Sequence, residues 1–558
     1  MDLAHPFLTE QLIAYIGNKR ALLPFLHGVL SRLIDEPSRS AFLDPFAGSG
    51  AVSRLARLMG FEVHANDWEP YSFVINSCHL GVAQGELSRL FGDNGGLPAL
   101  MHALNSLSVQ PREEYISRHY APRATATADW RTERLFYTRE NALAIDLLRE
   151  RIEALYPGQP DTADARAEKC ILLASLLYEA ATHTNTSGVF KACHKGFGGH
   201  GRDALSRILA PIRVHVPVLV DSPRASTMHC MDAAAFLRGR SADVCYLDPP
   251  YAGHQYGSNY FMLNTIALWD KPAVSGERGA DGRFRQKAGI RQDWTKTRSA
   301  FCYRASALPA LKETLEAADC RWIVVSYSNE GVISLEELCD VLASSGSLAI
   351  HSTGYVKYPG GKQSLSRTTR NLELALVVDR RGRRRAGGAT HSLQQARLAQ
   401  LLAGSFAPAR VRAAFATKGD CILAPARGSR RLALPMRHFW RFGDGARQAR
   451  LPTGPAVQGL ISALPACAVR DVREEIEVVA RIARTLTDAR EQAALLREAV
   501  RLLNRLAHRK NDAAFGTSLA LLRACRAPAA FAARYDASLI AVEERARLRA
   551  ASSRGAPA

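Results

Sequence analysis

The sequence predicts an α/β protein built on a Rossmann-like, doubly wound sheet. Three observations lead to this prediction. Strand-like and helix-like stretches alternate across residues 40–380, which is the pattern of such a sheet. A short strand leads through a glycine-rich turn into a helix near residue 48. Another strand ends abruptly in two prolines at residues 249 and 250.

The glycine-rich turn reads Asp44-Pro45-Phe46-Ala47-Gly48-Ser49-Gly50 and lies between the strand 41–43 and a helical run. Gly48 and Gly50 would let the backbone approach a bound cofactor closely. The next strand, 61–65, leads to Asp67, 19 residues after Gly48, where Rossmann-like folds bind ribose hydroxyls. Because position 53 is serine rather than the third glycine of the dinucleotide pattern, the turn favours a nucleoside cofactor without phosphates.

The stretch Asp248-Pro249-Pro250-Tyr251 follows the apolar strand 243–247. Two prolines cannot continue a strand, so the acid and the ring are held at its carboxyl end, where open α/β sheets bind ligands. Asp248 and the Pro249 carbonyl could accept both hydrogens of an exocyclic amino group, while Tyr251 offers a stacking face. The pattern indicates chemistry on a nucleobase amino group, although a strand ending in a proline turn looks the same.

Two further stretches could contact a cofactor. Tyr15-Ile16-Gly17-Asn18-Lys19 precedes an apolar helical pattern, and a cation there could hold an anionic group near the helix start. An ordinary helix entry gives the same pattern. Asp232 precedes a short helical stretch, where it could accept from an adenine amino group or simply cap the helix.

The net charge of +20 comes from the C-terminal third. Residues 1–379 hold 40 Lys and Arg against 40 Asp and Glu, whereas residues 380–558 hold 33 against 13. This asymmetry indicates a nucleic-acid partner, or an arginine-rich coding bias that leaves a solvated surface. Residues 380–385 indicate a linker, and helical spacing over 472–506 predicts a mostly helical domain.

Other features bear on metals and on cellular location. His183, Cys193, His194 and His200 match no metal-ligand spacing, so we expect no metal. The chain begins without a signal-peptide pattern, no apolar run approaches the ~20 residues needed to cross a bilayer, and the eleven cysteines form no Cys-x-x-Cys pair. We therefore expect a cytoplasmic protein with reduced thiols that does not associate with membranes. We also expect it to be a monomer or a weak dimer.

Over residues 10–380 the sequence resembles the Dam-type (α-class) adenine-N6 DNA methyltransferases. The resemblance rests on four motifs in the same order: Tyr15–Lys19, Asp44–Gly50, Asn66-Asp67 and Asp248–Tyr251. The resemblance implies a class I methyltransferase fold with S-adenosylmethionine as methyl donor. Lys19 and Tyr15 would lie at its methionine end, Asp67 at its ribose and Asp232 at its adenine. The remaining expected contacts are Asp44, Pro45, Phe46, Gly48 and Gly50 around the cofactor, and Asp248, Pro249, Pro250 and Tyr251 around a flipped adenine.

The resemblance also implies a domain layout. Residues 1–79 and 226–380 would form the catalytic domain, 80–225 an inserted region that reads the DNA target, and 381–558 a basic, mostly helical domain of unknown role. Basic, aromatic and glycine residues interleave in the insertion, and one loop there loosely resembles the family's Asn-containing aromatic loop. The candidate DNA contacts are Asn185, Phe190, Lys191, Lys195 and Arg202.

We therefore expect a site-specific enzyme that methylates the N6 amino group of a flipped adenine in double-stranded DNA. Bacterial restriction-modification or epigenetic marking would be its setting, and a cognate restriction endonuclease could accompany it. Methylation of cytosine N4, RNA or a protein amide is an open alternative. A DNA-binding protein that has kept the fold and lost activity is another.

Overall fold

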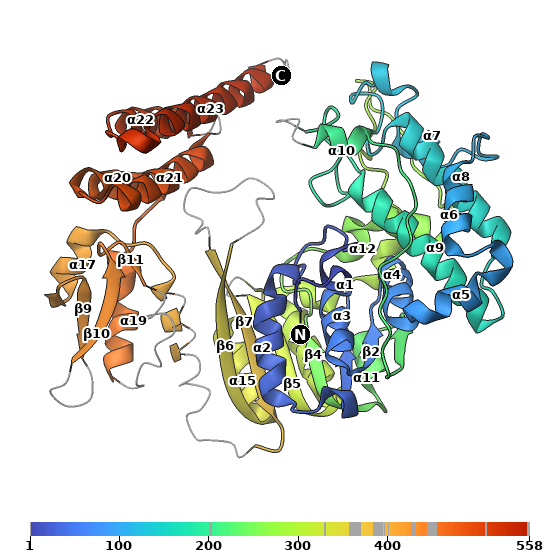
Figure 1. Ribbon diagram of the computed structural model, residues 1–558, viewed down its shortest axis with the longest axis horizontal. Coiled ribbons are helices and arrows are strands. Elements are labelled where there is room, and N and C mark those ends of the chain that lie inside the picture. Colours follow the sequence, from blue (N-terminus) through green and yellow to red (C-terminus); the bar gives the residue numbers. More distant parts are fainter. Residues whose placement is uncertain are drawn as a thin grey trace. The chain divides into compact units, whose positions relative to one another are not determined.

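The computed structural model describes residues 2–199, 204–328, 331–356, 370–382, 394–395, 397–399, 401–425, 431–443, 455–507 and 511–554 (Figure 1). The chain divides into two compact units. Unit 1 comprises Met1–His351 and Leu374–Ala386, and unit 2 comprises Ser352–Glu373 and Gly387–Ala558.

Unit 1 is organised around a seven-stranded sheet with the order β3-β2-β1-β4-β5-β7-β6. β1 pairs in parallel with β2 and with β4, β2 pairs in parallel with β3, and β4 with β5. The strands are β1 (Ala41–Asp44), β2 (Glu62–Asn66), β3 (Ser226–His229), β4 (Ser241–Leu247), β5 (Asp319–Ser328), β6 (Ser347–Val356) and β7 (Arg370–Asp379).

This arrangement confirms the predicted α/β fold class. The strand order reverses between β1 and β4, because the chain runs from β1 out to β3 and then returns to β4. Leu43 of β1 lies opposite His64 of β2 and Cys245 of β4, so the carboxyl ends of these three strands meet at one edge of the sheet. Ligands of open α/β sheets bind at such a switch point.

Helices surround the sheet and separate its strands along the chain. Before β1 come α1 (Pro6–Thr9), η1 (Arg20–Leu22), α2 (Leu23–Leu33) and η2 (Pro37–Arg39), and α3 (Ala51–Met59) joins β1 to β2. After β3 come α11 (Ala233–Leu237), α12 (Tyr256–Asn259), α13 (Phe261–Leu268), η6 (Gln292–Thr297), η7 (Ala300–Cys302), α14 (Arg304–Ala317) and α15 (Leu335–Ser345).

A long helical segment lies between β2 and β3 and gathers at one side of the unit (Figure 1). Its elements are α4 (Pro70–Gly81), η3 (Gln84–Glu86), α5 (Leu87–Leu90), η4 (Gly92–Asn94), α6 (Leu97–Asn105), α7 (Ile116–Tyr120), η5 (Thr125–Thr127), α8 (Arg139–Leu155), α9 (Ala163–Thr182) and α10 (Leu205–Leu209). Its apolar side chains share one core with α13.

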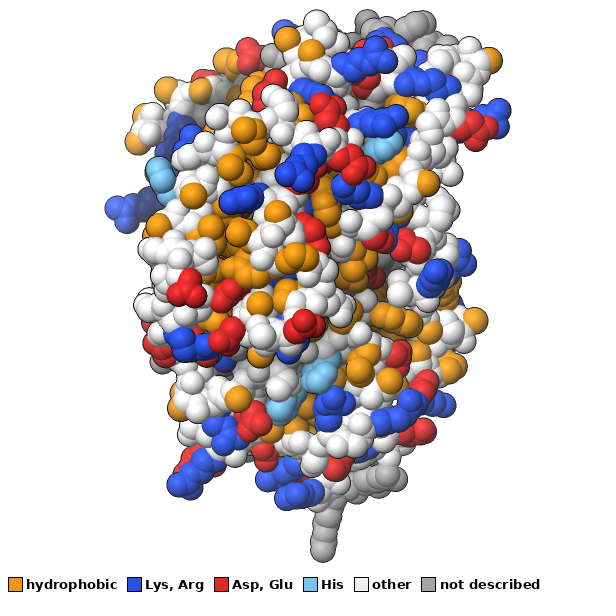
Figure 2. Space-filling model, turned by 90° about the vertical axis from the view of Figure 1, so that its right-hand side faces the viewer, with side chains coloured by type: hydrophobic (Ala, Val, Ile, Leu, Met, Phe, Trp, Pro, Cys, Tyr) orange, Lys and Arg blue, Asp and Glu red, His pale blue; other side chains and the backbone are white. Residues whose placement is uncertain are grey.

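Two buried charged residues on α8 fix this segment to its neighbours. Asp146 accepts hydrogen bonds from the backbone N–H groups of Tyr115, Ile116 and Ser117 at the start of α7. Arg149 donates to the carbonyls of Ile266 and Ala267 at the end of α13. The surface seen from this side carries basic and acidic side chains intermingled (Figure 2), in keeping with the balanced charge of residues 1–379.

Unit 2 combines a small sheet with long helices. The sheet has the order β11-β10-β9-β8 and packs with α17 and α19 around one apolar core, while the last four helices share another. The elements are α17 (Pro408–Ala414), β8 (Thr417–Lys418), β9 (Cys421–Pro425), β10 (Arg431–Arg437), β11 (Arg441–Phe442), α19 (Pro455–Cys467), α20 (Val472–Thr485), α21 (Ala489–Leu506), α22 (Asp512–Arg523) and α23 (Ala529–Arg554). α20 and α21 correspond to the helical spacing over residues 472–506, but the sheet was not predicted.

All eleven cysteines are free thiols. None of the described helices is long and apolar enough to cross a membrane.

Candidate active site

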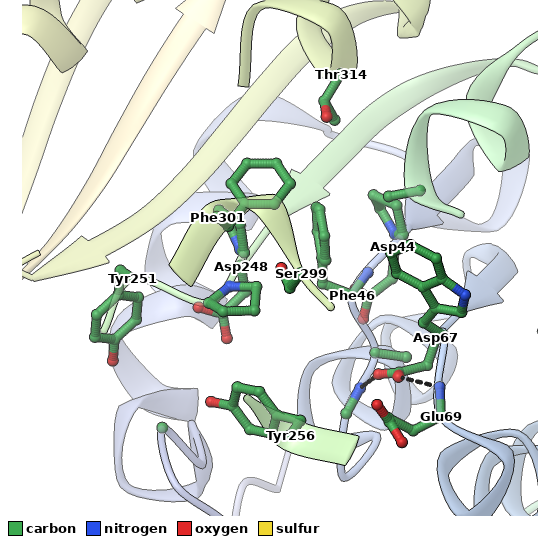
Figure 3. A pocket seen from close by; sticks show the side chains of 18 of the residues that line it. Asp44, Phe46, Asp67, Glu69, Asp248, Tyr251, Tyr256, Ser299, Phe301 and Thr314 are labelled. Atoms are coloured by element: carbon green, nitrogen blue, oxygen red, sulfur yellow. Dashed lines mark hydrogen bonds between the residues drawn. The ribbon is translucent and has the colours of Figure 1, made fainter. Parts of the chain in front are cut away.

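A pocket opens at the carboxyl ends of β1, β2 and β4 (Figure 3). It is lined by almost all the residues that the sequence predicted for cofactor and target: Tyr15, Lys19, Asp44, Pro45, Phe46, Gly48, Asp67, Asp232, Asp248, Pro249, Pro250 and Tyr251. Gly50 does not line it. Instead, Gly50 is the N-cap of α3, with a φ of 80°.

The glycine turn is held by Asp67. Gly48 has a φ of 53°, and its N–H donates to Asp67 Oδ2 at 2.7 Å, while the N–H of Glu69 donates to Asp67 Oδ1 at 2.9 Å (Figure 3). A Cβ added at Gly48 would lie 2.9 Å from Cε1 of Tyr15. The turn and the Tyr15 ring are therefore in close contact, and only glycine fits between them.

Asp44, the first residue of the same turn, fixes it through hydrogen bonds. Its side chain is fully buried and accepts from the Ser53 hydroxyl at 2.6 Å and from the Phe46 N–H at 3.3 Å. Burial raises the pKa of Asp44 to about 7, even though the Ser53 hydrogen bond lowers it. Ser53, at the position where the dinucleotide pattern has a glycine, thus holds the carboxyl that begins the turn.

Half-buried Asp248 forms an ion pair with buried Lys19. Lys19 Nζ lies 2.8 Å from Asp248 Oδ2 and 5.2 Å from the centre of the Tyr251 ring. The other oxygen, Oδ1, is buried and has no hydrogen-bond partner in the described structure. Burial raises the pKa of Asp248 and Lys19 lowers it. One carboxylate oxygen is therefore neutralised, and the other is an unused acceptor, which is costly to bury without a ligand.

Three tyrosines that the sequence analysis did not select support Tyr15. Its ring stacks on Tyr260 with centroids 4.8 Å apart and lies 5.1 Å from the ring of Tyr256, while the Tyr71 hydroxyl donates to its hydroxyl at 3.1 Å. Ile16 is bound on both sides, because its N–H donates to the Tyr260 hydroxyl and its carbonyl accepts from the Tyr256 hydroxyl. This cluster fixes the segment that carries Lys19.

The far wall of the pocket comes from residues 297–301, which the sequence analysis also missed. Phe301 packs edge-on against Phe46 with centroids 5.3 Å apart. Ser299 is tied to Gln255, because the Ser299 N–H donates to Oε1 of Gln255 and the Ser299 carbonyl accepts from its Nε2. In Figure 3 Asp248 lies among Tyr251, Tyr256 and Phe301, with Asp67 and Glu69 at the other end.

The electrostatic character of the pocket is acidic. Its acidic lining residues are Asp44, Asp67, Glu69, Asp232, Asp248 and Glu313, and its basic ones are Lys19 and Arg298. Burial raises the pKa of Glu69 to about 7. Asp232 caps α11 by accepting from the N–H of Ala235 at 3.0 Å, the plainer of its two predicted roles, yet it still faces the pocket. Such a lining favours a cationic ligand over one that carries phosphates.

The candidate DNA contacts fall into two groups. Lys191 and Lys195 are exposed. Asn185 and Phe190 are buried, which argues against direct contact with DNA for both. The Asn185 amide donates to the Leu135 carbonyl and accepts from the Gly198 N–H, so it joins two loops. Arg202 lies outside the described residues.

Comparison with known proteins gives a family match and several relatives. The family model for D12 class N6 adenine-specific DNA methyltransferases matches residues 15–302. The chain is 29% identical to the type II methyltransferase M.NlaIII of Neisseria lactamica over 349 residues, which is 62% of this chain and 93% of that protein. It is 29% identical to M.CviAII of Paramecium bursaria Chlorella virus 1 over 61% of this chain and 90% of that protein. Against M.FokI of Planomicrobium okeanokoites, identity is 27% over 62% of this chain and 49% of that protein.

Proposed function

Because the chain belongs to the D12 class N6 adenine-specific DNA methyltransferase family, we propose that it transfers a methyl group from S-adenosylmethionine to N6 of an adenine in double-stranded DNA, and that the pocket beside Asp248 is where this happens. The observation that carries the proposal is the buried, unpaired Oδ1 of Asp248 at the end of β4. An acceptor in that position suits an exocyclic amino group.

The lining of the pocket fits the proposed methyl donor. The donor is a sulfonium cation with no phosphate, and it supplies an electrophilic methyl group when bound. Acidic residues outnumber basic ones in the lining even without Asp44 and Glu69, whose pKa values burial raises to about 7, and this favours such a cation. We assign the Gly48 turn, Phe46 and Phe301 to its nucleoside, Asp67 to its ribose and Asp232 to its adenine. Both oxygens of Asp67 already accept backbone N–H groups, and each keeps a second lone pair for a hydroxyl.

The residues that follow β4 would orient the N6 amino group of the target adenine. Asp248 Oδ1 accepts one N6 hydrogen, the Pro249 carbonyl accepts the other, and Tyr251 stacks on the extruded base. Two acceptors localise electron density on a nitrogen whose lone pair is otherwise delocalised into the ring. Tyr251 is held in place because its carbonyl accepts from the Val332 N–H at 2.9 Å. Catalysis would thus come from positioning and from these acceptors.

The test compares the wild-type protein with two variants, Asp248→Ala and Asp248→Asn, each expressed in cells that lack adenine methylation of their own. Long-read sequencing of the cellular DNA is expected to show N6-methyladenine at one short motif with the wild type only. Both variants are expected to bind S-adenosylmethionine in calorimetry, because the cofactor contacts remain. Asp35→Asn, a change of an exposed carboxylate, is the matched control and keeps methylation.

Two outcomes would overturn the proposal. One is folded wild-type protein that binds the cofactor and leaves DNA unmodified; RNA and protein would then be assayed as methyl acceptors. The other is methylated DNA with Asp248→Ala, because the pocket beside β4 would then not be the site of transfer.

The relatives named as type II methyltransferases support a second part of the proposal, a role in restriction-modification beside a cognate endonuclease. We expect the enzyme to act as a monomer or a weak dimer. Once the methylated motif is known, DNA from expressing cells is expected to resist an endonuclease that cuts at that motif, and full cleavage would count against this role.

A further inference from the structure

A short hairpin follows α13 in the sequence, downstream of the Asp248–Tyr251 motif at the end of β4. The N–H of Arg285 donates to the Glu277 carbonyl, and the N–H of Gly279 donates to the Arg283 carbonyl, both at 2.9 Å. Arg278 and Phe284 form an antiparallel bridge between them. Residues 277–285 therefore form a defined β-hairpin in a stretch rich in Gly and Arg.

This hairpin is docked onto the helical insertion. Phe284 lies between two guanidinium groups, with the Cζ of Arg134 4.0 Å and that of Arg278 4.1 Å from its ring centre. Arg134 is buried and donates to the carbonyls of Ser275 and Gln286 on either side of the hairpin. Arg278 donates across to the Thr132 carbonyl at 2.9 Å. The hairpin therefore has a fixed position beside residues 130–134.

The docking brings three cations around one half-buried indole. The Trp130 ring centre lies 4.4 Å from Lys195 Nζ, 5.0 Å from Arg131 Cζ and 5.5 Å from Arg283 Cζ. The three come from the loop before α8, the loop after α9 and the hairpin. We call Trp130, Arg131, Lys195 and Arg283 the Trp130 cluster.

The charges of the Trp130 cluster are only partly compensated among the described residues, because Arg131 and Arg283 form exposed ion pairs whereas Lys195 forms none. The closest carboxylate oxygens lie 3.6 Å from Arg131 and from Arg283, on exposed neighbours two residues away. Lys195 makes no ion pair among the described residues, and its Nζ lies over the Trp130 ring. Like charges gathered at one point repel each other unless they share an anion.

We propose that the Trp130 cluster binds the phosphate backbone of DNA next to the target base, and that the hairpin 277–285 thereby belongs to the DNA interface together with the insertion. The inference rests on the proposed DNA substrate. DNA recognition was expected from residues 80–225. The inference adds residues 277–285, which follow the motif Asp248–Tyr251 in the sequence.

The cluster is within reach of the same duplex as the pocket. Phe190, the neighbour of Lys191, donates its N–H to the Asn259 carbonyl at the end of α12 at 2.7 Å, eight residues after Tyr251. Lys191 and Lys195 are four residues apart, so their Cα atoms are at most about 14 Å from each other. That distance corresponds to roughly four base steps along one strand. One short loop therefore leads from the pocket mouth to the cluster.

The experiment measures binding of the full chain to a short fluorescein-labelled DNA duplex at NaCl concentrations from about 50 to 200 mM. Lys195→Gln and Arg283→Gln are compared with the wild type, singly and together. We expect the slope of log K against log salt to fall by about one for each lost phosphate contact, and binding to weaken severalfold. Arg39→Gln is the control, because Arg39 is exposed and lies just before β1, at the opposite edge of the sheet.

Calorimetry with S-adenosylmethionine shows whether each variant keeps its fold and cofactor site. A double variant that binds cofactor normally and has the salt slope of the wild type would overturn the inference, because the cluster would then carry only solvated charges. That result leaves methylation of DNA intact and so differs from failure of the proposed function, in which the wild type itself leaves DNA unmodified.

Discussion

Lys19 Nζ and Asp248 Oδ2 lie 2.8 Å apart, with Lys19 almost fully buried. Lys19 was expected at the methionine end of the cofactor, and the pair places its charge on the proposed catalytic acid as well. Lys19 also donates to the Gly17 carbonyl, so its position is fixed by the segment that the tyrosine cluster holds. Burial raises the pKa of Asp248 and the pair with Lys19 lowers it, so the pair favours the ionised carboxylate, which is the stronger hydrogen-bond acceptor.

Lys19→Gln is expected to move the acid limb of the pH–rate profile to higher pH. Burial already raises the pKa of Asp248 and Lys19 opposes that rise. Removing an adjacent opposite charge should raise the pKa by about one to three units. The carboxylate is a stronger acceptor than the protonated carboxyl, so transfer is expected to slow as the pH falls, at a higher pH than in the wild type, and to recover as the pH rises. Single-turnover rates at saturating cofactor separate this effect from weaker cofactor binding.

The control for Lys19→Gln is Arg20→Gln, which removes an exposed neighbouring cation that does not line the pocket. Its pH profile is expected to match that of the wild type. A Lys19→Gln profile with an unshifted acid limb would show that the ion pair does not set the ionisation of Asp248.

The free energy of unfolding of the cofactor-free Asp44→Asn protein is compared with that of the wild type. The difference is expected to favour Asp44→Asn more at pH 8 than at pH 5. The pKa of buried Asp44 is raised from its usual value near 4 to about 7. An acid with a raised pKa contributes stability that is present below its unfolded pKa and is lost as the pH rises through the folded one. The full effect is at most about 4 kcal/mol.

Thermal unfolding across pH 5 to 8 measures this difference, with exposed Asp35→Asn as the control. Melting temperatures of Asp44→Asn and wild type that run parallel over the whole range would mean that Asp44 stays ionised in the folded protein.

Gly48→Ala is expected to weaken S-adenosylmethionine binding at least about tenfold. A left-handed backbone costs a residue with a Cβ about 1–2 kcal/mol, and this Cβ would also displace the Tyr15 ring. Gly92→Ala is the matched control, since a Cβ there meets nothing within 4 Å. Calorimetry measures the affinity. Unchanged binding by Gly48→Ala would show that the turn is not part of the cofactor site.

Local patterns made the centre of the site predictable. The turn Asp44–Gly50 and the strand end at Asp248 each follow an apolar strand and contain residues with special backbone demands. Parallel pairing then brings the two strand ends together. The supporting residues could not be found in this way, because Tyr260 meets Tyr15 across 245 residues and Phe301 meets Phe46 across 255. Such contacts depend on the tertiary fold alone.

The sheet of unit 2 was missed for a different reason. β8 and β11 have two residues each, and β9 and β10 contain Pro425 and Pro435. Short strands with proline lack the long alternating pattern that indicates a sheet, and proline is expected only at edges or bulges. The long amphipathic helices that follow have strong 3.6-residue periodicity and N-caps at Asp471 and Asp488, so their prediction was easier.

Asn185 and Lys191 were both predicted to contact DNA, but Asn185 is buried and Lys191 is exposed. Asn185→Ala is expected to lower the free energy of unfolding by about 1–3 kcal/mol, since the Leu135 carbonyl and the Gly198 N–H would lose their partner in a buried site. Lys191→Gln is expected to leave unfolding unchanged, because Lys191 is exposed, and to reduce the salt slope of DNA binding by about one. Chemical denaturation and the salt titration measure the two quantities. An Asn185→Ala protein with wild-type stability and impaired DNA binding would restore Asn185 as a direct contact, because a residue that only joins two loops must affect folding when its amide is removed.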